Sequence, residues 1–490
     1  MSTEVVEVRH GAYHDSVTLM RVGRTLADRD DVLDALTAMA TELNLDLLEQ
    51  LGFPVPAEAG PNDLVVALRA ASEAAIEGAL EALDTLLSAS SGPGPSAAQG
   101  GLGTPAPPRT TGSAATRGDA SLALVSVPGD HAFTEAMDAL TAGLNVMIFS
   151  DNVTVAQEIR LKDEAARRGL IVMGPDCGTA VIGGAGLGFA NAVRPGPVGL
   201  VAASGTGSQQ VMCLLDAAGV GISHALGVGG RDLSAHVSGR STLQALTALD
   251  ADPATELILV VSKPPAPKVA DLIREAARRL TTPTLFALLG TGQDDLTAAV
   301  EKALTALGVR VPEWPSLPFP QTPASGLLRG LFVGGTLCDE AMLIAASALG
   351  PIRSNIPLRP EWALGPPGHS MIDFGDDAMT LGRAHPMIDP TLRLERLAAE
   401  AADPSTGVLL LDVVLGYGAE PDPAALLAPA IEAARAGRDL PVVVSLCGTA
   451  ADPQDRDRQA SALQSAGAAV FLSNAAATRH AVALIQGGPA

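Results

Sequence analysis

The sequence has few cysteines and no long apolar run. Its four cysteines lie far apart: Cys177, Cys213, Cys338 and Cys447. They show no CxxC spacing, which argues against a zinc site or a disulfide framework and favours a reducing, cytoplasmic setting. No run approaches the roughly 18 apolar residues of a membrane span, and the first residues lack the apolar core of a signal peptide. We therefore expect a cytoplasmic protein without a membrane partner.

Basic residues are also scarce. The chain has 32 Lys and Arg against 54 Asp and Glu, a formal net charge of −22. Such an excess repels phosphate backbones, so we expect no nucleic-acid partner. Small anions can still be ligands, because a local group of backbone N–H donors holds them even in an acidic protein. Apolar residues make up 47% of the 490 residues, enough for a large core and several domains.

Changes in composition divide the chain into several units. Helix-like segments lie around 16–27, 31–43 and 64–87, and a stretch rich in Ser, Gly, Pro and Ala follows. Short apolar runs then alternate with helical periods, which predicts parallel sheets and a multidomain α/β fold. The predicted order is an N-terminal α/β region (1–87), a flexible linker (88–118), a Rossmann-like domain (119–194), a flavodoxin-type domain (195–310), a Pro-rich linker (311–326) and a second flavodoxin-type domain (327–490).

The two flavodoxin-type domains are predicted to be copies of each other. "VAASGTGSQQV" (201–211) and "FVGGTLCDEAM" (332–342) share an apolar strand, a turn of small residues and a helix start. "LDADPATELILVV" (249–261) also aligns with "EAADPSTGVLLLDV" (400–413). The second copy is longer between the turn and this helix, in residues 354–390. We predict that the copies differ functionally in this insertion.

Each repeated turn is a candidate anion site. A Gly-rich loop that leads into a helix leaves N–H groups unpaired, and the helix dipole adds partial positive charge, so a phosphate or carboxylate binds there without Lys or Arg. An ordinary strand-to-helix turn is the alternative for either turn alone. Two equivalent turns favour helix N-termini that point at one shared anion. The candidate phosphate-binding residues are Ser204, Gly205, Thr206, Gly207, Gly334, Gly335 and Thr336.

Several longer motifs resemble one family over essentially the whole chain. They are "GPDCGTAVIGGAGLGFANAV" (174–193), "GVGGRDLS" (227–234), "VSKPPAP" (261–267), "HSMIDFGDDAMTLGRAHPMIDPTLR" (369–393) and "LLLDVVLGYGAEPDP" (409–423). The family is that of FdrA proteins, which are relatives of succinyl-CoA synthetase. The resemblance implies a CoA-binding-type Rossmann domain, followed by two succinyl-CoA synthetase-like domains whose helix starts face a phosphate or phosphohistidine.

The sequence departs from the synthetase pattern in three places. The phosphohistidine segment Gly-His-Ala-Gly-Ala is replaced by "GTGQDDL" (290–296), no ATP-grasp domain is present, and the Gly-rich CoA loop is replaced by the N-terminal region. These departures count against CoA and ATP, so no cofactor is predicted. No metal site is predicted either, because the Asp and Glu residues are too dispersed. Asp376 and Asp377 offer only weak support for Mg²⁺.

The resemblance implies a carbamoyltransferase. The implied reaction converts oxalurate and phosphate to oxamate and carbamoyl phosphate, in purine and allantoin catabolism, with partner subunits in a hetero-oligomer. A homodimer is also open. Two other functions stay open: an acyl-CoA synthetase or ligase of the NDP-forming type that needs partner subunits, and a non-catalytic scaffold.

Polar residues near predicted strand ends complete the candidate site. In the insertion, Arg383 is expected to bind a carboxylate or phosphate oxygen, and His369 or His385 to transfer a proton. The alternative is a solvated surface loop. Asp232 has an equally good interpretation as a helix N-cap, and Lys263 as a surface lysine. The cysteines other than Cys447 are expected to be core or helix residues. The candidate substrate-binding residues are Asn191, Arg231, Lys263, Asp376 and Thr449.

Overall fold

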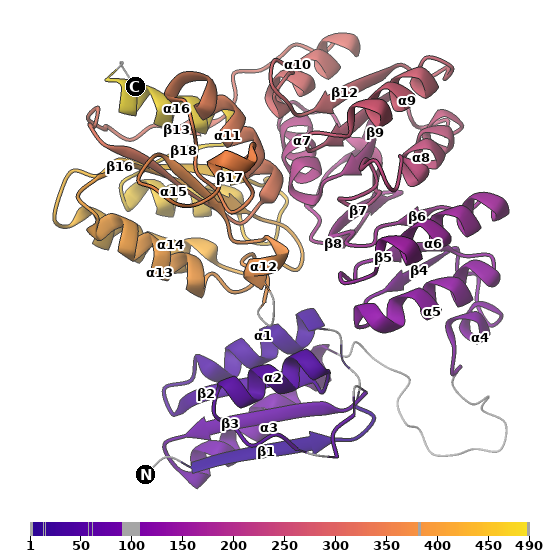
Figure 1. The fold of residues 1–490 in the computed structure, drawn as a ribbon, viewed down its shortest axis with the longest axis vertical. Helices are drawn as coiled ribbons and strands as arrows, with labels where there is room; N and C mark the ends of the chain where they lie inside the picture. The colour runs from indigo at the N-terminus through magenta and orange to yellow at the C-terminus, as the bar shows by residue number, and fades with distance from the viewer. Residues whose placement is uncertain are drawn as a thin grey trace.

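The computed structural model describes residues 3–12, 14, 16–56, 58–60, 62–90, 108–380 and 384–487. Its strands form four sheets, two of three strands and two of six. Figure 1 shows the small N-terminal domain beside the last domain of the chain, while the two domains with six-stranded sheets lie next to each other. The fold is multidomain α/β, as predicted.

The N-terminal domain is an antiparallel sheet between helices. Its strands pair in the order β1 (Thr3–Arg9), β3 (Leu64–Ala70), β2 (Val32–Met39). Helices α1 (Ser16–Ala27) and α3 (Glu73–Ser90) cover one face, and α2 (Glu42–Gln50) covers the other. The helix-like interpretation is wrong for 31–43, which contains β2, and for the start of 64–87, which is β3. For β3 the reason is that the strand is buried on both faces and therefore shows a continuous apolar run.

The second domain is a short parallel sheet. Its elements are β4 (Leu122–Val125), α5 (Gly129–Thr141), β5 (Asn145–Ile148), α6 (Val155–Arg168) and β6 (Val172–Met173), with α4 (Thr111–Ala115) before them. Helix α6 begins with a capping box, in which Thr154 accepts from the Gln157 N–H and the Gln157 side chain returns to Thr154. Helices α3 and α4 reach into the predicted linker 88–118, and residues 91–107 lie outside the described part of the chain.

The third domain contains the first copy of the repeat. Its elements are β7 (Thr179–Ile182), β8 (Ala185–Gly188), β9 (Pro195–Ala203), α7 (Gly205–Ala217), β10 (Ile222–Gly227), α8 (Arg240–Asp250), β11 (Leu257–Ser262), α9 (Pro267–Ala277), β12 (Thr284–Leu288) and α10 (Leu296–Ala306). The sheet order is β12-β11-β9-β10-β7-β8. We expected 179–188 in the Rossmann-like domain (119–194), but the structure places this hairpin on the sheet of the third domain, because β7 pairs with β10.

The fourth domain contains the second copy. Its elements are β13 (Ser316–Leu317), β14 (Leu327–Phe332), α11 (Gly335–Leu349), the 3₁₀ helix η1 (Pro360–Trp362), β15 (Ser370–Asp373), α12 (Asp377–Thr380), α13 (Thr391–Ala402), β16 (Thr406–Val414), α14 (Pro423–Arg435), β17 (Val442–Cys447), α15 (Arg456–Ser465), β18 (Ala468–Phe471) and α16 (Asn474–Gln486). The order β15-β14-β16-β17 repeats β10-β9-β11-β12, and every pair in both series is parallel. This is the doubly wound order of flavodoxin-like sheets, with the ligand crevice at the carboxyl ends of the strands.

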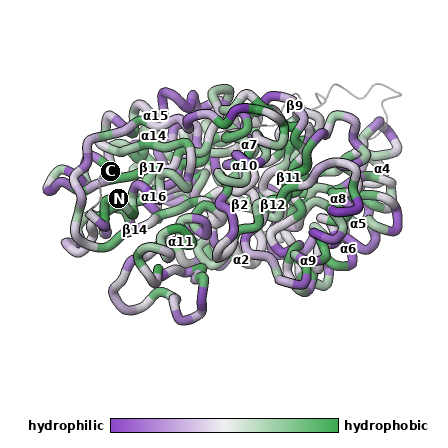
Figure 2. The backbone as a smooth tube through the Cα atoms, turned by 90° about the horizontal axis from the view of Figure 1, so that it is seen from above, coloured by the Kyte–Doolittle hydropathy of each residue, from purple (hydrophilic) through white to green (hydrophobic). Residues whose placement is uncertain are grey.

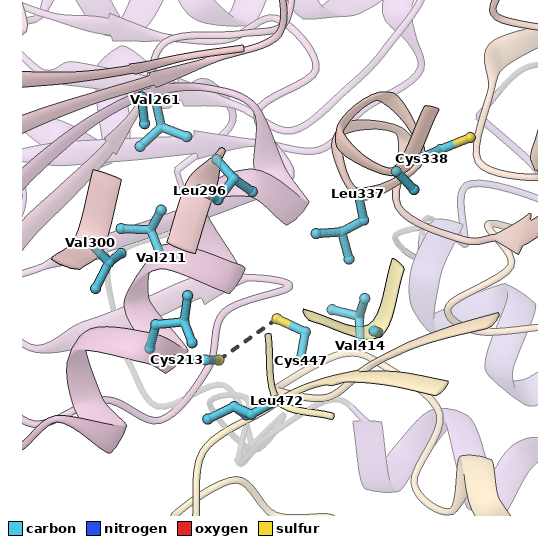
Figure 3. Close-up of a cluster of buried hydrophobic side chains, with 14 of the residues drawn as sticks. Val211, Cys213, Val261, Leu296, Val300, Leu337, Cys338, Val414, Cys447 and Leu472 are labelled. Atoms are coloured by element: carbon cyan, nitrogen blue, oxygen red, sulfur yellow. Dashed lines mark hydrogen bonds between the residues drawn. The ribbon is translucent and has the colours of Figure 1, made fainter. Parts of the chain in front are cut away.

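One apolar core joins the two copies. It combines Val211 of α7 and Val300 of α10 with Leu337 of α11 and Val482 of α16, all of them buried. Figure 2 shows apolar segments running through the interior and hydrophilic segments gathered along the outside. Figure 3 shows Val211 and Leu337 on facing sides of this core. The third and fourth domains therefore share one apolar core.

The cysteines are core residues. All four are buried and free, and burial raises the pKa of the Cys177 thiol to about 12. Figure 3 shows Cys213 and Cys447 meeting across the core, with their sulfur atoms 3.8 Å apart. That separation is too long for a disulfide bond.

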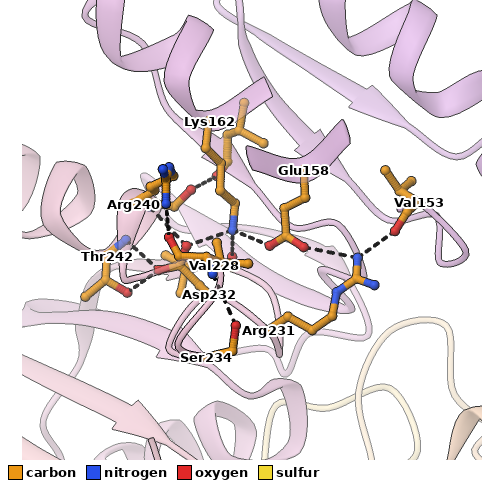
Figure 4. Close-up of polar contacts among 12 residues, drawn as sticks. Val153, Glu158, Lys162, Val228, Arg231, Asp232, Ser234, Arg240 and Thr242 are labelled. Atoms are coloured by element: carbon orange, nitrogen blue, oxygen red, sulfur yellow. Dashed lines mark hydrogen bonds and ion pairs between the residues drawn. The ribbon is translucent and has the colours of Figure 1, made fainter. Parts of the chain in front are cut away.

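A buried ion network attaches the second domain to the third (Figure 4). Lys162 Nζ of α6 donates to Glu158 Oε1 at 2.7 Å, to Asp232 Oδ1 at 2.8 Å and to the Val228 carbonyl at 2.9 Å. Asp232 also accepts from the N–H groups of Ser241 and Thr242 in the first turn of α8. Asp232 thus satisfies N–H groups at the start of α8, as an N-cap would, but the N-cap residue itself is Gly239. Among the described residues, no helix is long and apolar enough to cross a bilayer.

We predict that Lys162→Met lowers the free energy of unfolding by about 3–5 kcal/mol, because it removes a cation that two buried carboxylates share. The matched control is Arg167→Ala on the same helix, where an exposed Arg pairs with Glu164 and the loss should stay below about 1 kcal/mol. Differential scanning calorimetry of both variants tests this. Equal shifts for the two variants would contradict it.

Candidate functional site

The two predicted anion turns meet in the structure. Ser204 is the N-cap of α7, and its Oγ accepts from the Gly207 N–H at 3.0 Å. The same hydroxyl donates to Thr336 Oγ1, in the first turn of α11, at 2.6 Å. The N-termini of α7 and α11 therefore touch, one from each copy of the repeat. We call this contact the helix junction.

Glycines allow the helices to approach this closely. A Cβ on Gly334 would lie 2.9 Å from Thr206 Oγ1, and a Cβ on Gly207 would lie 2.9 Å from Thr336 Cγ2. Both distances are shorter than an ordinary carbon contact. Thr206 and Thr336 are equivalent residues of the two copies, so each packs on a glycine of the other copy.

Backbone N–H groups at the helix junction differ in their partners. The Val333 and Gly334 N–H groups donate to Asp412, at 2.8 and 2.9 Å. The first two N–H groups of each helix, at 205–206 and 335–336, find no acceptor among the described residues. Unpaired N–H groups at helix starts are the donors that bind anions in proteins.

A cation and two buried carboxylates lie beside the start of α11. Lys263, which follows β11, places its Nζ 2.9 Å from the point where a Cβ of Gly335 would stand, and Asp373 Oδ2 lies 2.7 Å from that point. Lys263 Nζ also lies 3.9 Å from Asp339 Oδ2. Of the candidate substrate-binding residues, Lys263 is the one that the structure brings to the helix junction.

Burial shifts the titration of these groups. It raises the pKa of Asp373 to about 7 and that of Asp339 to about 6, although Lys263 acts in the opposite direction on both. Burial alone would lower the pKa of Lys263, but Asp339 and Asp373 outweigh it and the pKa is raised. The junction therefore combines a lysine that stays protonated with carboxyl groups that exchange protons near neutral pH.

The two predicted histidines lie at opposite ends of the sheet. His385 Nε2 is 2.8 Å from the point where a Cβ of Gly375 would stand, two residues after Asp373. His369 precedes β15, and its Nδ1 accepts from the Leu328 N–H near the start of β14. The helix junction lies at the carboxyl ends of the strands, so the structure removes His369 from the candidate site. Arg383 lies outside the described residues.

His385 is suited to donate a hydrogen bond. Its Nδ1 accepts from the Met387 N–H at 3.2 Å, which leaves the proton of a neutral ring on Nε2. Burial lowers its pKa to about 4, and its ring centroid lies 5.8 Å from that of Phe189. At neutral pH His385 is therefore an uncharged ring that offers its Nε2–H as a hydrogen-bond donor.

The other predicted substrate contacts have partners within the protein. Asn191 Nδ2 donates to the Leu415 carbonyl at 2.9 Å and to Asp452 Oδ2 at 2.7 Å, and Thr449 Oγ1 donates to the Ala192 carbonyl at 2.7 Å. These bonds join the third domain to the fourth. An open cavity of about 380 Å³ adjoins them, lined by 184–186, 191–193 and Tyr417.

Arg231 and Asp376 also have local roles. Arg231 lies 3.1 Å from Glu158 and donates to the Val153 carbonyl at 2.7 Å. Asp376 accepts from the Ala378 N–H in the first turn of α12 at 3.1 Å. The side chain of Asp377, its partner in the weak Mg²⁺ prediction, is outside the described residues. No group of three or more His, Cys, Asp or Glu that could hold a metal occurs in the described part of the chain.

Sequence reasoning missed the importance of Asp339 and Asp373. Asp373 is the last residue of β15, at the carboxyl end of a parallel strand, where ligand-binding side chains gather in such sheets. Asp339 is one turn along α11 from Gly335. The position of Asp339, four residues after Gly335, was visible in the sequence. The position of Asp373 was not, because the short strand β15 inside the insertion was not recognised.

Comparisons with known proteins define the class. Residues 331–484 match the CoA-ligase family model. The alpha 2 subunit of an ADP-forming succinate–CoA ligase from Archaeoglobus fulgidus is 26% identical over 219 residues, 40% of this chain and 74% of that subunit. The malate–CoA ligase alpha subunit of Methylorubrum extorquens is 28% identical over 165 residues, 32% of this chain and 54% of that subunit. The fold is that of the CoA-ligase class, related to succinyl-CoA synthetases.

A relative that matches over the full length shows the family. The uncharacterized protein YahF of Escherichia coli strain K12 is 38% identical over 507 aligned positions, covering 97% of both chains. The chain belongs to the YahF family. Residues 1–101 also match a model described as AllF, heavy metal-associated domain.

Solved structures are similar to parts of the chain. An ATP citrate lyase of Methanothrix soehngenii has a TM-score of 0.33 and 19% identity, over 41% of this chain and 37% of that one. A dinucleotide-forming acetyl-coenzyme A synthetase of Ca. Korarchaeum cryptofilum has a TM-score of 0.27 and 18% identity, over 75% of this chain and 84% of that one.

The predicted enzyme class is wrong. The family model describes CoA ligases, and the succinate and malate relatives are CoA ligase subunits, not carbamoyltransferases; nothing in them supports oxamate, carbamoyl phosphate or allantoin catabolism. The physical reason for the error is that a pair of helix starts selects anions by charge and size. Such a site does not distinguish one phosphate-releasing reaction from another.

Residues 1–101 provide no thiolate for a soft heavy metal. Soft metals prefer thiolate and thioether ligands; all four cysteines lie beyond residue 101, and the thioethers before it are those of Met1, Met20 and Met39. His10 Nδ1 in this domain lies 3.1 Å from Asp63 Oδ2. Asp63 also accepts from the Gly11 and Gly60 N–H groups. We derive no chemistry from a metal here.

We predict that Gly334→Ala lowers the free energy of unfolding by about 1–3 kcal/mol, because the added methyl group collides with Thr206 across the helix junction. Gly205→Ala is the matched control, since its Cβ would stand 3.5 Å from its nearest neighbour, Thr179 Oγ1. Urea unfolding followed by the fluorescence of Trp314 and Trp362 measures both. Equal losses would contradict the close approach.

We predict that Asp373→Asn stabilises the protein at pH 8 and has little effect at pH 4.5. The folded-state pKa of about 7 exceeds the ordinary 3.8, so ionisation destabilises the fold increasingly between about pH 4 and 7. The full cost, on the order of 4 kcal/mol, is present above pH 7. Urea unfolding at both pH values measures it.

Asp403→Asn is the control of opposite sign for this experiment. Bonds from Ser405 hold the pKa of Asp403 below its ordinary value, so its ionised form stabilises the fold. Removing that charge should lower stability at pH 8. A wild-type protein that is no less stable than Asp373→Asn at pH 8 would overturn the analysis of Asp373.

Proposed function

We propose that this chain is the acyl-transfer component of an acyl-CoA synthetase of the NDP-forming type that works with partner subunits. The observation that carries the proposal is the helix junction, where Ser204 and Thr336 meet at 2.6 Å. The CoA-ligase match over 331–484 supports it, as do relatives that are named alpha subunits of CoA ligases.

The proposed reaction converts an acyl phosphate and CoA to an acyl-CoA and phosphate. The CoA sulfur attacks the acyl carbon, and the bond from that carbon to the phosphate oxygen breaks. Phosphate leaves with the electron pair, and the thiol proton passes to a base or to the departing phosphate. The helix starts stabilise the charge that develops on phosphate, because their N–H groups are already oriented.

Side chains at the junction have complementary roles in this proposal. Ser204 donates to Thr336 Oγ1, so the Thr336 proton can be donated onward to a phosphate oxygen. Lys263 supplies the positive charge that an acyl phosphate requires. In this proposal the Nε2–H of His385, which lies beside Gly375, binds the reacting carbonyl oxygen.

We assign recognition of nucleotide and of the CoA pyrophosphate to partner subunits. The resemblance places CoA on the Rossmann-like domain, whose β4–α5 turn has a single glycine, Gly129. A Cβ there would lie 2.4 Å from the Asp151 carbonyl oxygen, so a neighbouring loop fills the space beside it. Asp130 follows directly. This turn does not fit a pyrophosphate group, which favours a glycine-rich loop free to approach it.

We predict CoA-dependent phosphate release from an acyl phosphate without nucleotide, by the chain combined with the subunits that co-purify with it. Acetyl phosphate and succinyl phosphate are the first substrates to try. Thr206→Val or Thr336→Val should lower the rate about 100-fold, because each removes a hydroxyl donor at the junction. Phosphate release and thioester absorbance are measured together.

Thr247→Val is the matched control. This exposed threonine of α8 donates to the Leu243 carbonyl within its own helix, so its loss should leave the rate unchanged. The proposal fails if no thioester forms with any combination of chain, subunits and nucleotide. It also fails if both junction variants keep the wild-type rate.

A further inference from the structure

Arg24 of the N-terminal domain reaches the fourth domain. Its Nη1 donates to the Ile388 carbonyl at 2.6 Å and lies 3.4 Å from Glu420 Oε2 and 3.6 Å from Asp389 Oδ1. Its Nε lies 3.7 Å from Asp28 on the same helix. Figure 1 shows α1 directly below the part of the fourth domain that contains α12. This one side chain thus joins residues that are 364 positions apart in the sequence.

The carbonyl that Arg24 binds belongs to the turn that holds His385. We call residues 385–389 the His385 turn. The His385 carbonyl accepts from the N–H groups of Ile388 and Asp389, at 2.8 and 3.1 Å, and its ring accepts from the Met387 N–H. The Glu420 N–H donates to the Met387 carbonyl at 2.8 Å. The backbone groups that orient the His385 ring are the His385 carbonyl and the Met387 N–H. Both lie within three residues of the Ile388 carbonyl, to which Arg24 donates.

The contact between the N-terminal domain and the His385 turn depends on the positive charge of Arg24. Asp389, Glu420 and Asp28 place three carboxylates around one guanidinium. Without the guanidinium the carboxylates repel one another, and the Ile388 carbonyl loses a charged donor. Hydrogen bonds to charged groups are about twice as strong as neutral ones.

We propose that the N-terminal domain is a positioning domain for the site and that Arg24 is its positioning residue. Docking of Arg24 holds the His385 turn, so that His385 Nε2 stays beside Gly375 and the helix junction. Detachment loosens the turn and slows acyl transfer. The effect on catalysis rests on the proposed function, whereas the docking itself does not.

Hydrogen exchange of the peptide covering 384–390 tests the docking in the full-length protein. Arg24→Ala should speed exchange of its amides about tenfold, the factor expected for loss of one charge-assisted hydrogen bond. Arg24→Lys should restore part of the protection. Arg21→Ala, on the same helix and exposed, should leave exchange unchanged. The pair Arg24→Glu with Glu420→Arg should recover protection that Arg24→Glu alone removes.

Kinetics separate a positioning role from a purely structural one. In Arg24→Ala, kcat for CoA-dependent phosphate release should fall about tenfold while KM for the acyl phosphate is unchanged, because the helix junction is intact. Unchanged exchange in Arg24→Ala overturns the proposal, and so does faster exchange with an unchanged kcat. If the wild-type protein releases no phosphate, the proposed function fails, and exchange still decides whether Arg24 holds the turn.

Discussion

Two helix N-termini that touch carry partial charges of the same sign, and the rest of the structure depends on holding them together. Each start contributes roughly half a positive charge, so the contact of Ser204 with Thr336 is electrostatically unfavourable by itself. The common apolar core below α7 and α11 offsets this cost. Asp412 offsets more of it, because its carboxylate accepts from the Val333 and Gly334 N–H groups. A bound anion would offset the remainder, which is why such a junction favours anionic ligands.

The regular part of this arrangement could be predicted from sequence, and the insertion could not. The repeated turns lie where expected because a small-residue turn between an apolar strand and a helix is a local pattern. In the insertion, the four-residue strand β15 was not recognised. This strand sets the position of the residues around it. His369, just before it, lies at the amino ends of the strands, whereas Asp373, its last residue, and His385, beyond it, lie at the carboxyl ends. A strand this short decides which side chains face the site.

Buried contacts between domains are also beyond local reasoning. Asn191 and Thr449 have the polar character of ligand-binding residues, but their partners are backbone carbonyls and Asp452, far away in sequence. The same holds for Lys162, which reads as an exposed helical lysine and is fully buried. Asp373 and Asp339 look ordinary in the sequence, but burial raises the pKa of both carboxyl groups even though Lys263 lies close by. The proposed reaction class rests on the relatives, because the geometry of the helix junction is compatible with several phosphate-releasing reactions.

The segment that connects the two copies has a consequence for assembly. Residues 311–326 are held near both ends: Trp314 Nε1 donates to Glu301 Oε1 at 2.9 Å, and the Ala324 N–H donates to the Leu484 carbonyl at 3.0 Å. The resemblance to succinyl-CoA synthetase places the two helix starts on separate subunits, whereas here they are covalently linked. The junction therefore forms by an intramolecular step with a fixed ratio of one to one. Dilution that would separate two subunits leaves this pair of helices together.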